Sequence, residues 1–322
     1  MKIAINGFGR IGRSVFRILE EQDDIEVVAI NDLFDYGALR YLLSYDTVMG
    51  PFGKSLTLED DHFVTDKGRV KLLSIRNPDD LPWRDLGVDA VVEATGVFRK
   101  AEQLQQHLAA GAGRVVLTVP SKDPVDYTVV LGVNEDGLNA EHRIISNASC
   151  TTNCLAPMAR VLDEAFGIEE GVINTVHAYT NDQRLADVPH TDWRRSRAAA
   201  ENIIPTSTGA AKAVGEVLPQ LKGKLHGIAA RVPVPDGSVV DLFVKLGNRV
   251  TVADVNEVVR AASATQRLRG ILHYCETPIV STDIIGNSHS SIYDAGFTGV
   301  IADRYLRVLN WYDNEWGYSC RV

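Results

Sequence analysis

Apolar residues in the first half of the chain form short runs that alternate with amphipathic segments. The runs at residues 2–5, 26–30, 90–93 and 114–119 predict buried strands, and the apolar spacing at 11–20, 36–43 and 101–110 predicts helices between them. An alternation of strand and helix is typical of a parallel sheet that is covered by helices on both faces. The first half therefore predicts a doubly wound α/β domain.

The pattern changes from Val172 onward. Longer apolar runs at 172–176, 227–232, 238–245 and 305–312 predict strands, with helices expected at 207–218 and 252–262. This order predicts a second, α+β domain built on a mixed or antiparallel sheet. The boundary is predicted at residues 147–150, where polar residues precede a helical run at 155–166.

Composition agrees with two globular domains. The chain has 322 residues, 45% hydrophobic and 23% charged, which is too long for one ordinary core. The net charge of -9 provides no basic field for nucleic acid or an anionic membrane, and no apolar run approaches the roughly 20 residues of a membrane helix. A strand pattern begins almost directly after Met1, so no signal peptide is expected. We therefore expect a cytoplasmic protein that binds neither nucleic acid nor membranes.

Three glycines follow the first predicted strand. Gly7, Gly9 and Gly12 form the pattern G-x-G-x-x-G between a strand and a helix, the context in which it indicates a Rossmann-type dinucleotide site. The first glycine permits a tight turn, the second lets the backbone approach a pyrophosphate, and the third allows close packing of helix on strand. A glycine-rich turn without a ligand is the alternative.

An acidic residue ends the second predicted strand. Asp32 lies twenty residues after Gly12, where a carboxylate can accept hydrogen bonds from an adenosine ribose and repels a 2′-phosphate. Asp32 therefore indicates NAD rather than NADP as the cofactor. Alternatively, Asp32 caps a following helix.

One of the four cysteines lies where a thiol can be activated. Cys150 follows Ser149, a candidate helix cap, and enters the first turn of a predicted helix, where partial positive charge favours a thiolate. A nearby imidazolium would lower the pKa of the Cys150 thiol further, and His177, at the end of a predicted strand, is the candidate. From the residues alone, a catalytic Cys/His pair stays open against an inert cysteine and a surface histidine.

Cys154 lies four residues after Cys150 on the same helical face, a spacing compatible with a metal pair or a redox couple. No second Cys/His pair stands at ligand spacing, so we favour a small buried side chain for Cys154, and likewise for Cys275 and Cys320. Neither a metal site nor a disulfide scaffold is expected.

Cationic and hydroxyl residues gather between residues 192 and 231. Arg194, Arg195 and Arg197 fall in a predicted loop, the run Thr206-Ser207-Thr208-Gly209 precedes a helix, and Arg231 ends a predicted strand. Guanidinium forks, hydroxyls and the N–H groups of a helix start suit a phosphate. A solvated or subunit-facing loop is the alternative for the arginine run.

Four longer segments resemble signatures of the glyceraldehyde-3-phosphate dehydrogenases. They are INGFGRIGR at 5–13, SNASCTTNCLAP at 146–157, IIPTSTGAAK at 203–212 and WYDNE at 311–315. The similarity runs essentially from end to end, with the motifs in the family's order. It implies a phosphorylating, NAD-linked aldehyde dehydrogenase of glycolysis and gluconeogenesis, with an NAD-binding domain at 1–149, to which 313–322 return, and a catalytic domain at 150–312.

The resemblance also implies roles for individual residues, with Cys150 as the nucleophile and His177 as its activating partner. The implied cofactor contacts are Gly7, Gly9, Arg10, Ile11, Gly12, Asp32, Arg76, Thr118 and Asn314. The implied substrate-phosphate site comprises Thr180, Asp182 and Arg231, and the implied inorganic-phosphate site comprises Ser149, Thr151, Arg195, Thr208 and Gly209. Arg10 and Ile11 meet the pyrophosphate in this scheme, and Asn314 fixes the nicotinamide.

The implied chemistry is covalent. The Cys150 thiolate attacks the aldehyde of glyceraldehyde 3-phosphate, hydride passes to NAD while His177 takes the hydroxyl proton, and inorganic phosphate releases the thioester as an acyl phosphate. His177, then cationic, and the backbone N–H of Cys150 stabilise the oxyanion. Relatives use the segment 180–201 at a subunit interface, so a homotetramer is expected.

Three rival functions are weighed against this one. An erythrose-4-phosphate dehydrogenase would use the same cysteine and histidine, but Thr180 and the run 207–209 favour the triose substrate. Asp32 and Pro189 argue against an NADP-accepting photosynthetic enzyme. A non-enzymatic binding protein of the same fold would not need the thiol, the imidazole and both anion sites together. One departure from the family pattern, Val-Pro-Asp-Gly at 234–237 in place of the more usual Thr-Pro-Asn-Val, reads as a tight turn without an assigned function.

Overall fold

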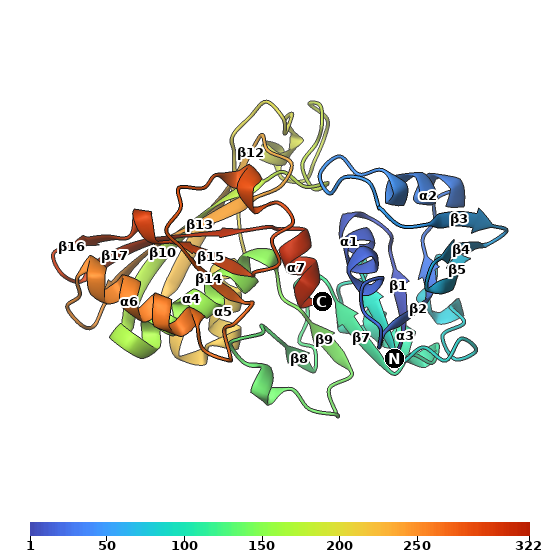
Figure 1. Ribbon diagram of the computed structural model, residues 1–322, viewed down its shortest axis with the longest axis horizontal. Coiled ribbons are helices and arrows are strands. Elements are labelled where there is room, and N and C mark those ends of the chain that lie inside the picture. The colour runs from blue at the N-terminus through green and yellow to red at the C-terminus, as the bar shows by residue number, and fades with distance from the viewer. The chain divides into compact units, whose positions relative to one another are not determined.

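The computed structural model describes residues 1–322, which form two compact units. The first comprises Met1–Val129, Gly137–Ala148 and Ser319–Val322, and the second comprises Val130–Asp136 and Ser149–Tyr318. Each unit has its own sheet (Figure 1).

The first unit is built on a nine-stranded sheet with the order β3-β4-β5-β2-β1-β6-β7-β9-β8. Its strands are β1 (Lys2–Asn6), β2 (Glu26–Asn31), β3 (Leu56–Glu59), β4 (His62–Thr65), β5 (Gly68–Leu73), β6 (Ala90–Glu93), β7 (Arg114–Leu117), β8 (Tyr127–Thr128) and β9 (Ile144–Ser146). Its helices are α1 (Arg10–Leu19), α2 (Tyr36–Ser44) and α3 (Ala101–Ala109). The strands from β5 to β8 run parallel, and β3 and β4 add an antiparallel edge. The predicted Rossmann-type sheet is confirmed.

Strand β1 illustrates why this sheet is covered on both faces. Successive side chains of a strand point to opposite faces. Ile3 and Ile5 lie in one hydrophobic cluster with Phe16 of α1, whereas Ala4 lies in a second cluster with the fully buried Trp83. A continuous apolar run without alternation is therefore the sequence pattern that this strand requires.

The second unit is built on an eight-stranded mixed sheet with the order β11-β12-β10-β13-β17-β15-β14, and β16 pairs with β17. Its strands are β10 (Ile168–Ala178), β11 (Ile204–Ser207), β12 (Leu225–Val232), β13 (Ser238–Leu246), β14 (Leu272–Cys275), β15 (Ser291–Asp294), β16 (Gly299–Ile301) and β17 (Tyr305–Tyr312). Its helices are α4 (Cys150–Phe166), α5 (Ala210–Val217) and α6 (Val252–Ser263), and α7 (Trp316–Arg321) begins in it. The pairs β10/β12 and β14/β15 are parallel and the others are antiparallel, which confirms the predicted mixed sheet.

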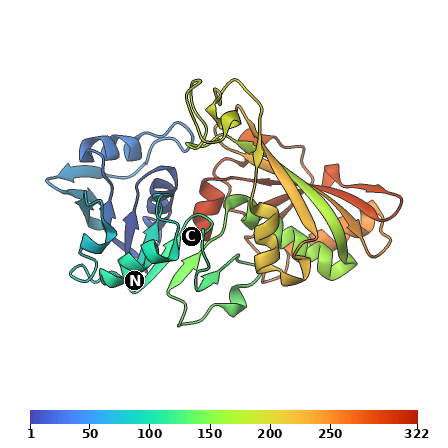
Figure 2. The ribbon, with the colours of Figure 1, turned by 180° about the vertical axis from the view of Figure 1, so that it is seen from behind.

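Helices cover one side of this second sheet. Helix α4 packs on β10, β13, β15 and β17, α5 packs on β12, and α6 packs on β14 (Figure 1). Figure 2 shows β10 and β12 from the opposite side. Val172 and Ile228, on these two strands, are exposed, so part of an apolar sheet face carries no cover within the chain.

Two predicted helix starts are wrong by several residues. The helix expected at 207–218 begins at Ala210, because residues 204–207 pair as β11 with β12 and Ser207 belongs to that strand. The helical run expected at 155–166 begins five residues earlier at Cys150, where Ser149 caps it. The second difference agrees with the separate prediction that Cys150 enters the first turn of a helix.

Candidate active site

In the glycine turn between β1 and α1, Gly7 and Gly12 are closely packed and Gly9 is open. Gly7 has φ +93°, and a Cβ added there would lie 2.6 Å from the Thr95 nitrogen. A Cβ on Gly12 would lie 2.1 Å from the Gly7 carbonyl oxygen, whereas a Cβ on Gly9 would meet nothing within 4 Å. Two glycines are thus required by packing, and the third exposes backbone at the start of a helix. This arrangement fits a pyrophosphate.

Three other residues of the expected cofactor set lie beside this turn. Asp32, Arg76 and Thr118 follow the carboxyl ends of β2, β5 and β7. Because these strands run parallel to β1 in the order β5-β2-β1-β6-β7, the three residues and the glycine turn lie along one edge of the sheet. Open α/β sheets bind ligands at this edge.

The Asp32 carboxylate is tied to the glycine turn. Its Oδ2 accepts a hydrogen bond from the Phe8 N–H at 2.7 Å, and its Oδ1 accepts one from the Phe34 N–H at 3.2 Å. Helix α2 is capped instead by Asp35, whose Oδ1 accepts from the Ala38 N–H at 2.9 Å. The alternative interpretation of Asp32 as a helix cap is therefore wrong.

Two expected cofactor contacts have partners within the first unit. The Arg10 guanidinium forms an ion pair with Asp46, and the Thr118 hydroxyl donates to the Glu93 carbonyl oxygen at 3.0 Å. Arg10 and Ile11 are the first two residues of α1, so their backbone N–H groups point toward the glycine turn. We therefore expect backbone rather than guanidinium contacts with a pyrophosphate from this helix.

A buried polar network that the sequence did not predict supports the same edge. The Glu93 carboxylate, wholly buried, accepts from the Asn6 amide at 2.6 Å and contacts His107 Nε2 at 3.1 Å. The Asn31 amide donates to Asn6 Oδ1 at 2.7 Å. These bonds join the carboxyl ends of β1, β2 and β6. Because the partners lie far apart along the chain, no local pattern marks them.

In the second unit, Cys150 faces His177. Cys150 is the first residue of α4, where the Ser149 hydroxyl accepts the Thr152 N–H at 3.0 Å. The Cys150 Sγ lies 3.4 Å from Nε2 of His177, the penultimate residue of β10. This separation is within hydrogen-bond reach of a sulfur atom and brings the predicted nucleophile and base together.

Arg231 sits on the opposite side of the imidazole. The parallel pairing of β10 and β12 places Arg231 opposite His177. One guanidinium nitrogen lies 2.6 Å from His177 Nδ1 and donates to the Ala178 carbonyl oxygen at 2.9 Å, and Nδ1 lies 2.7 Å from the same oxygen. Nδ1 either donates to the Ala178 oxygen or accepts from Arg231, and the first of these tautomers leaves the Nε2 lone pair toward Cys150.

Burial keeps both members of the pair neutral. It raises the pKa of the Cys150 thiol, against the opposing influence of Arg231 and of Thr151. It also lowers the pKa of His177 to about 3, with the Arg231 guanidinium as the second cause. The expected thiolate beside an imidazolium is therefore not the state that this structure favours. A neutral imidazole beside a thiol can instead accept the thiol proton during reaction.

Tyr312 is a further residue of this site that the sequence missed. Its fully buried hydroxyl lies 2.8 Å from the hydroxyls of Thr151 and of Thr175, and its ring meets the edge of the His177 ring. Tyr312 thereby ties α4 to β10 at the level of the Cys/His pair. It falls inside the 311–315 motif, which was the one signal in the sequence that could have drawn attention to it.

The candidate substrate-phosphate residues surround Arg231. Arg195 forms an ion pair with Asp182 and donates from Nε to the Thr206 hydroxyl at 2.9 Å. The charges of Arg195 and Asp182 both act on the pKa of Arg231, which burial lowers. Thr180 turns back on Gln183, whose Oε1 accepts the Thr180 N–H at 2.8 Å. Of the three arginines in the loop, Arg195 is the one joined to this cluster, whereas Arg197 pairs with Asp187.

The residues expected at the inorganic-phosphate site, apart from Arg195, lie at two helix starts. Ser149 caps α4, and Gly209 is the N-cap of α5, where a Cβ would meet nothing within 4 Å. Helices α4 and α5 pack against each other. The Thr208 hydroxyl accepts the Ala210 N–H at 3.2 Å. Backbone N–H groups at such starts suit an anion, and the hydroxyls would then share existing hydrogen bonds.

Asn314 follows β17 and is held by one buried hydroxyl. Ser238 Oγ donates to Asn314 Oδ1 at 2.6 Å and accepts the Ala178 N–H at 3.1 Å. All three groups are buried. The bond fixes the orientation of the Asn314 amide and directs its NH2 group elsewhere, as a donor to the carboxamide of a nicotinamide requires.

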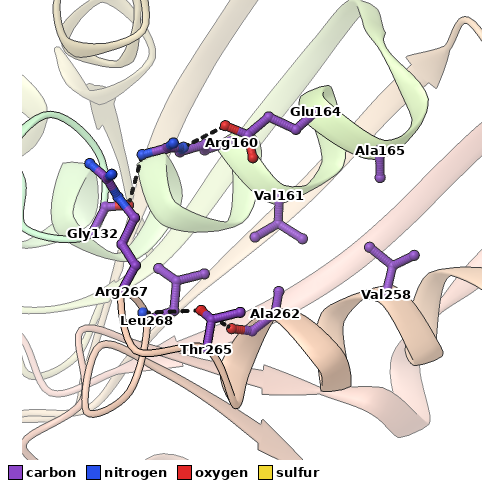
Figure 3. A pocket seen from close by; sticks show the side chains of 10 residues that line it. All are labelled: Gly132, Arg160, Val161, Glu164, Ala165, Val258, Ala262, Thr265, Arg267 and Leu268. Carbon is purple, nitrogen blue, oxygen red and sulfur yellow. Dashed lines mark hydrogen bonds and ion pairs between the residues drawn. The ribbon is translucent and has the colours of Figure 1, made fainter.

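A cleft of about 410 Å³ elsewhere in the second unit lies between α4 and α6 (Figure 3). Its two arginines are already paired, Arg160 with Glu164 and Arg267 with Glu135 and Asp136. The rest of its lining is mainly apolar, and it contains none of the predicted site residues. Nothing in it resembles the chemistry of the thiol site.

The remaining cysteines form no disulfide bonds. No cluster of three His, Cys, Asp or Glu side chains is arranged to hold a metal ion, and all four cysteines are free thiols. Cys154 is fully buried with Sγ near the Asn310 carbonyl oxygen at 3.6 Å, as expected for a small core side chain. None of the helices has the length and apolar character needed to cross a membrane.

Comparison with known proteins agrees with this geometry. Residues 1–101 match the family model described as the NAD binding domain of glyceraldehyde 3-phosphate dehydrogenase, and residues 149–314 match the model of its C-terminal domain. The chain is 56% identical to a glyceraldehyde-3-phosphate dehydrogenase of Borreliella burgdorferi and 54% identical to one of Streptomyces coelicolor, over 100% of this chain and 97% and 96% of those proteins. A glyceraldehyde-3-phosphate dehydrogenase 2 of Bacillus subtilis is 54% identical over 100% of the chain and 94% of its own length. With both domain models matched in order and full-length relatives at this identity, the chain belongs to the glyceraldehyde-3-phosphate dehydrogenase family.

Proposed function

We propose that this chain catalyses the NAD-dependent oxidative phosphorylation of D-glyceraldehyde 3-phosphate to 1,3-bisphosphoglycerate through a thioester on Cys150. The observation that carries the proposal is the 3.4 Å separation of Cys150 Sγ and His177 Nε2 at the start of a helix, with Arg231 beside them. The first unit would serve as the NAD-binding domain and the second as the catalytic domain. The reaction belongs to glycolysis and gluconeogenesis.

His177 acts first as a base. Because its pKa is lowered to about 3, the imidazole is neutral near pH 7 and accepts the thiol proton as Sγ bonds to the aldehyde carbon. It returns that proton to the new oxygen, and takes it again when the carbon loses hydride, which leaves a thioester. Bound NAD supplies the hydride acceptor for this step.

The protonated His177 then assists phosphorolysis. Phosphate attacks the thioester carbon, and His177 together with the Cys150 backbone N–H stabilises the oxyanion. Collapse of the oxyanion breaks the C–S bond, releases the acyl phosphate and returns the proton to sulfur. The buried hydroxyl of Tyr312, bonded to Thr151 of α4 and Thr175 of β10, keeps these two elements in place during both steps.

Two anion sites would hold the acceptor and the substrate, and the ion pair of Arg195 with Asp182 joins them. Arg231, with Thr180 and Asp182 nearby, would bind the phosphate of the triose, and Ser149, Thr151, Arg195, Thr208 and Gly209 would bind inorganic phosphate. The helix starts at α4 and α5 favour the latter assignment, because their N–H groups and dipoles attract an anion.

The assignment of the cofactor face rests on Asn314. The Ser238 hydroxyl accepts the Ala178 N–H and donates to Asn314 Oδ1, which leaves the amide NH2 of Asn314 available to a nicotinamide carboxamide. A fixed carboxamide exposes one ring face to the thiohemiacetal carbon. Asp32 supports NAD over NADP, because its carboxylate would repel a 2′-phosphate.

A homotetramer in the cytoplasm is proposed for the working enzyme. The exposed apolar side chains Leu185, Trp193 and Ile203, together with Val172 and Ile228 on the open sheet face, support burial against further copies of the chain.

The test is NADH formation from purified protein, NAD and glyceraldehyde 3-phosphate, with and without phosphate or arsenate. Turnover should require the anion, and Cys150→Ser should lower kcat/KM by roughly 10³-fold or more, because serine is a far weaker nucleophile. Cys320→Ser, at a cysteine outside the proposed site, is the matched control and should leave the rate unchanged. Turnover without phosphate would refute the phosphorylating reaction, and a higher kcat/KM on erythrose 4-phosphate would reassign the substrate.

A further inference from the structure

Two buried carboxyl groups lie together beside Asn314. Asp236 sits in the turn between β12 and β13, and Asp313 is the first residue after β17. Each is only 1% exposed. Two ionised carboxylates in so little water would repel each other strongly, so one of them must hold a proton or meet a cation.

Asp313 has the partners of an ionised carboxylate. Its Oδ1 accepts the N–H groups of Glu315 and Trp316 at 2.8 and 2.6 Å, and its Oδ2 accepts the Gly286 N–H at 2.7 Å. Three backbone donors stabilise the charged form and cap the start of α7. Both oxygens of Asp313 therefore serve as hydrogen-bond acceptors.

Asp236 has the partners of a neutral acid. Its Oδ1 accepts the Gly237 N–H at 2.8 Å, while its Oδ2 is buried and receives no hydrogen bond. The Asp313 carboxylate interacts with the Asp236 carboxyl group and, when ionised, has no hydrogen to give. A proton on Asp236 Oδ2 turns this repulsion into a hydrogen bond donated to Asp313.

The surroundings of Asp236 favour that proton. Burial, followed by the negative charges of Asp313 and Glu315, raises the pKa of Asp236 to about 9. Cys150, on α4, is also close enough for the two groups to interact: a negative charge on Asp236 would raise the pKa of the Cys150 thiol. The short helix Ser281–Ile284 carries Asp283, whose carboxylate accepts the Val280 N–H. The charges that act on the Asp236 carboxyl group, those of Asp313 and Glu315, are both negative, so neither would stabilise an ionised Asp236.

The turn cannot relieve the crowding by moving outward. Gly237 has φ +84°, and a Cβ there would lie 2.3 Å from the Ser281 carbonyl oxygen. The backbone of the turn therefore packs closely on Ser281 and leaves no room there for a side chain at position 237. One residue further on, Ser238 donates to Asn314, so two neighbouring contacts join the start of β13 to the turn after β17.

We propose that Asp236 is a positioning residue that stays a neutral carboxylic acid, donates a hydrogen bond to Asp313, and so holds Asn314 in its binding orientation until alkaline ionisation releases the turn. This inference rests on the proposed function only where Asn314 is taken to bind the nicotinamide carboxamide. The protonated acid itself is independent of any activity.

The first test compares wild type with Asp236→Asn, whose amide can donate the same hydrogen bond but cannot ionise. NAD affinity, followed by quenching of tryptophan fluorescence, should fall in the wild type by about tenfold for each pH unit above about pH 9, because only the neutral form holds Asn314. Asp236→Asn should show no such limb. Asp241→Asn is the control, because Asp241 is a half-buried carboxylate on β13 that pairs with Arg307 of β17, and this variant should keep the wild-type pH profile.

A second measurement needs neither NAD nor a variant that folds. Infrared difference spectra of the wild type between about pH 7.5 and about pH 10 should show the C=O stretch of a protonated carboxyl group that disappears at the higher pH. Absence of that band at the lower pH would overturn the proposal, as would an alkaline limb of NAD affinity that persists in Asp236→Asn. Absence of dehydrogenase turnover with the band present would count against the proposed function alone.

Discussion

Replacing Ser238 by alanine removes a hydroxyl that serves two buried groups at once. Ser238 Oγ accepts the Ala178 N–H at 3.1 Å and donates to Asn314 Oδ1 at 2.6 Å. Ala178 is fully buried and Asn314 is 5% exposed, so water does not readily replace the lost partner. Each orphaned buried group costs about 1–3 kcal/mol. We therefore expect Ser238→Ala to lower the free energy of unfolding by about 3 kcal/mol.

The same change should also affect the cofactor. Without the Ser238 hydroxyl, the Asn314 amide can rotate and present its oxygen instead of its NH2 group, so the KM for NAD should rise and kcat should fall while the KM for the triose stays close to that of the wild type. Urea unfolding measures the first effect, and steady-state kinetics with each substrate varied in turn measures the second.

The control is Ser263→Ala on α6. There the serine hydroxyl donates to the Arg260 carbonyl oxygen at 2.8 Å at the surface, where water can take its place, and the expected loss is below about 0.5 kcal/mol. If Ser238→Ala costs no more than this control, or leaves the KM for NAD unchanged, then the hydroxyl neither satisfies buried groups nor orients Asn314, and the reasoning fails.

Two further predictions concern the glycine turn and His177. Gly12→Ala should destabilise the first unit and abolish NAD binding, because its Cβ would lie 2.1 Å from the Gly7 carbonyl oxygen. Gly9→Ala should fold normally and weaken only NAD binding, because its Cβ would meet nothing within 4 Å. Thermal unfolding and NAD titration test both variants, and a Gly9→Ala variant less stable than Gly12→Ala would contradict the prediction. The pKa of His177 is lowered to about 3 in the folded chain, whereas in the unfolded chain it has the ordinary value of 6.5. As the pH falls below 6.5, the unfolded chain therefore takes up a proton before the folded chain does. Stability should accordingly decrease by about 3 kcal/mol from pH 7 to about pH 4.5, and this decrease should be smaller by that amount in His177→Asn; equal acid sensitivity in urea unfolding would contradict the buried neutral imidazole.

Local patterns were sufficient for the parts of the fold that local physics decides. The central strands β1 and β6 are buried on both faces, so their apolar runs are continuous, and β1, β6 and α3 were predicted to within a residue or two at either end. The antiparallel strands β3 and β4 were missed, because their half-exposed pattern gives a weak signal. The start of α5 was misplaced for a different reason: residues 204–207 carry helix-start signals, but their backbone pairs with β12.

The candidate site divides in the same way. Gly7, Gly12 and Cys150 depend on the adjacent turn or helix, and their places could be predicted from neighbouring residues. Ser238 and Tyr312 act through partners 60 to 161 positions away, which no spacing rule reveals. The choice between Asp32 and Asp35 as the cap of α2 also needed geometry, since both are acidic residues before the same helix.

The charge state of the Cys/His pair shows why the remaining property escaped the sequence. A helix start and a neighbouring histidine both argue for a thiolate, and each of those local effects is present. Burial acts on Cys150 and His177 together, however, and Arg231, brought opposite His177 by the pairing of β10 with β12, opposes a second positive charge. In a neutral pair the proton stays on sulfur until Sγ bonds to the aldehyde carbon, when the imidazole accepts it. Activation of the thiol then belongs to the bound complex rather than to the free enzyme.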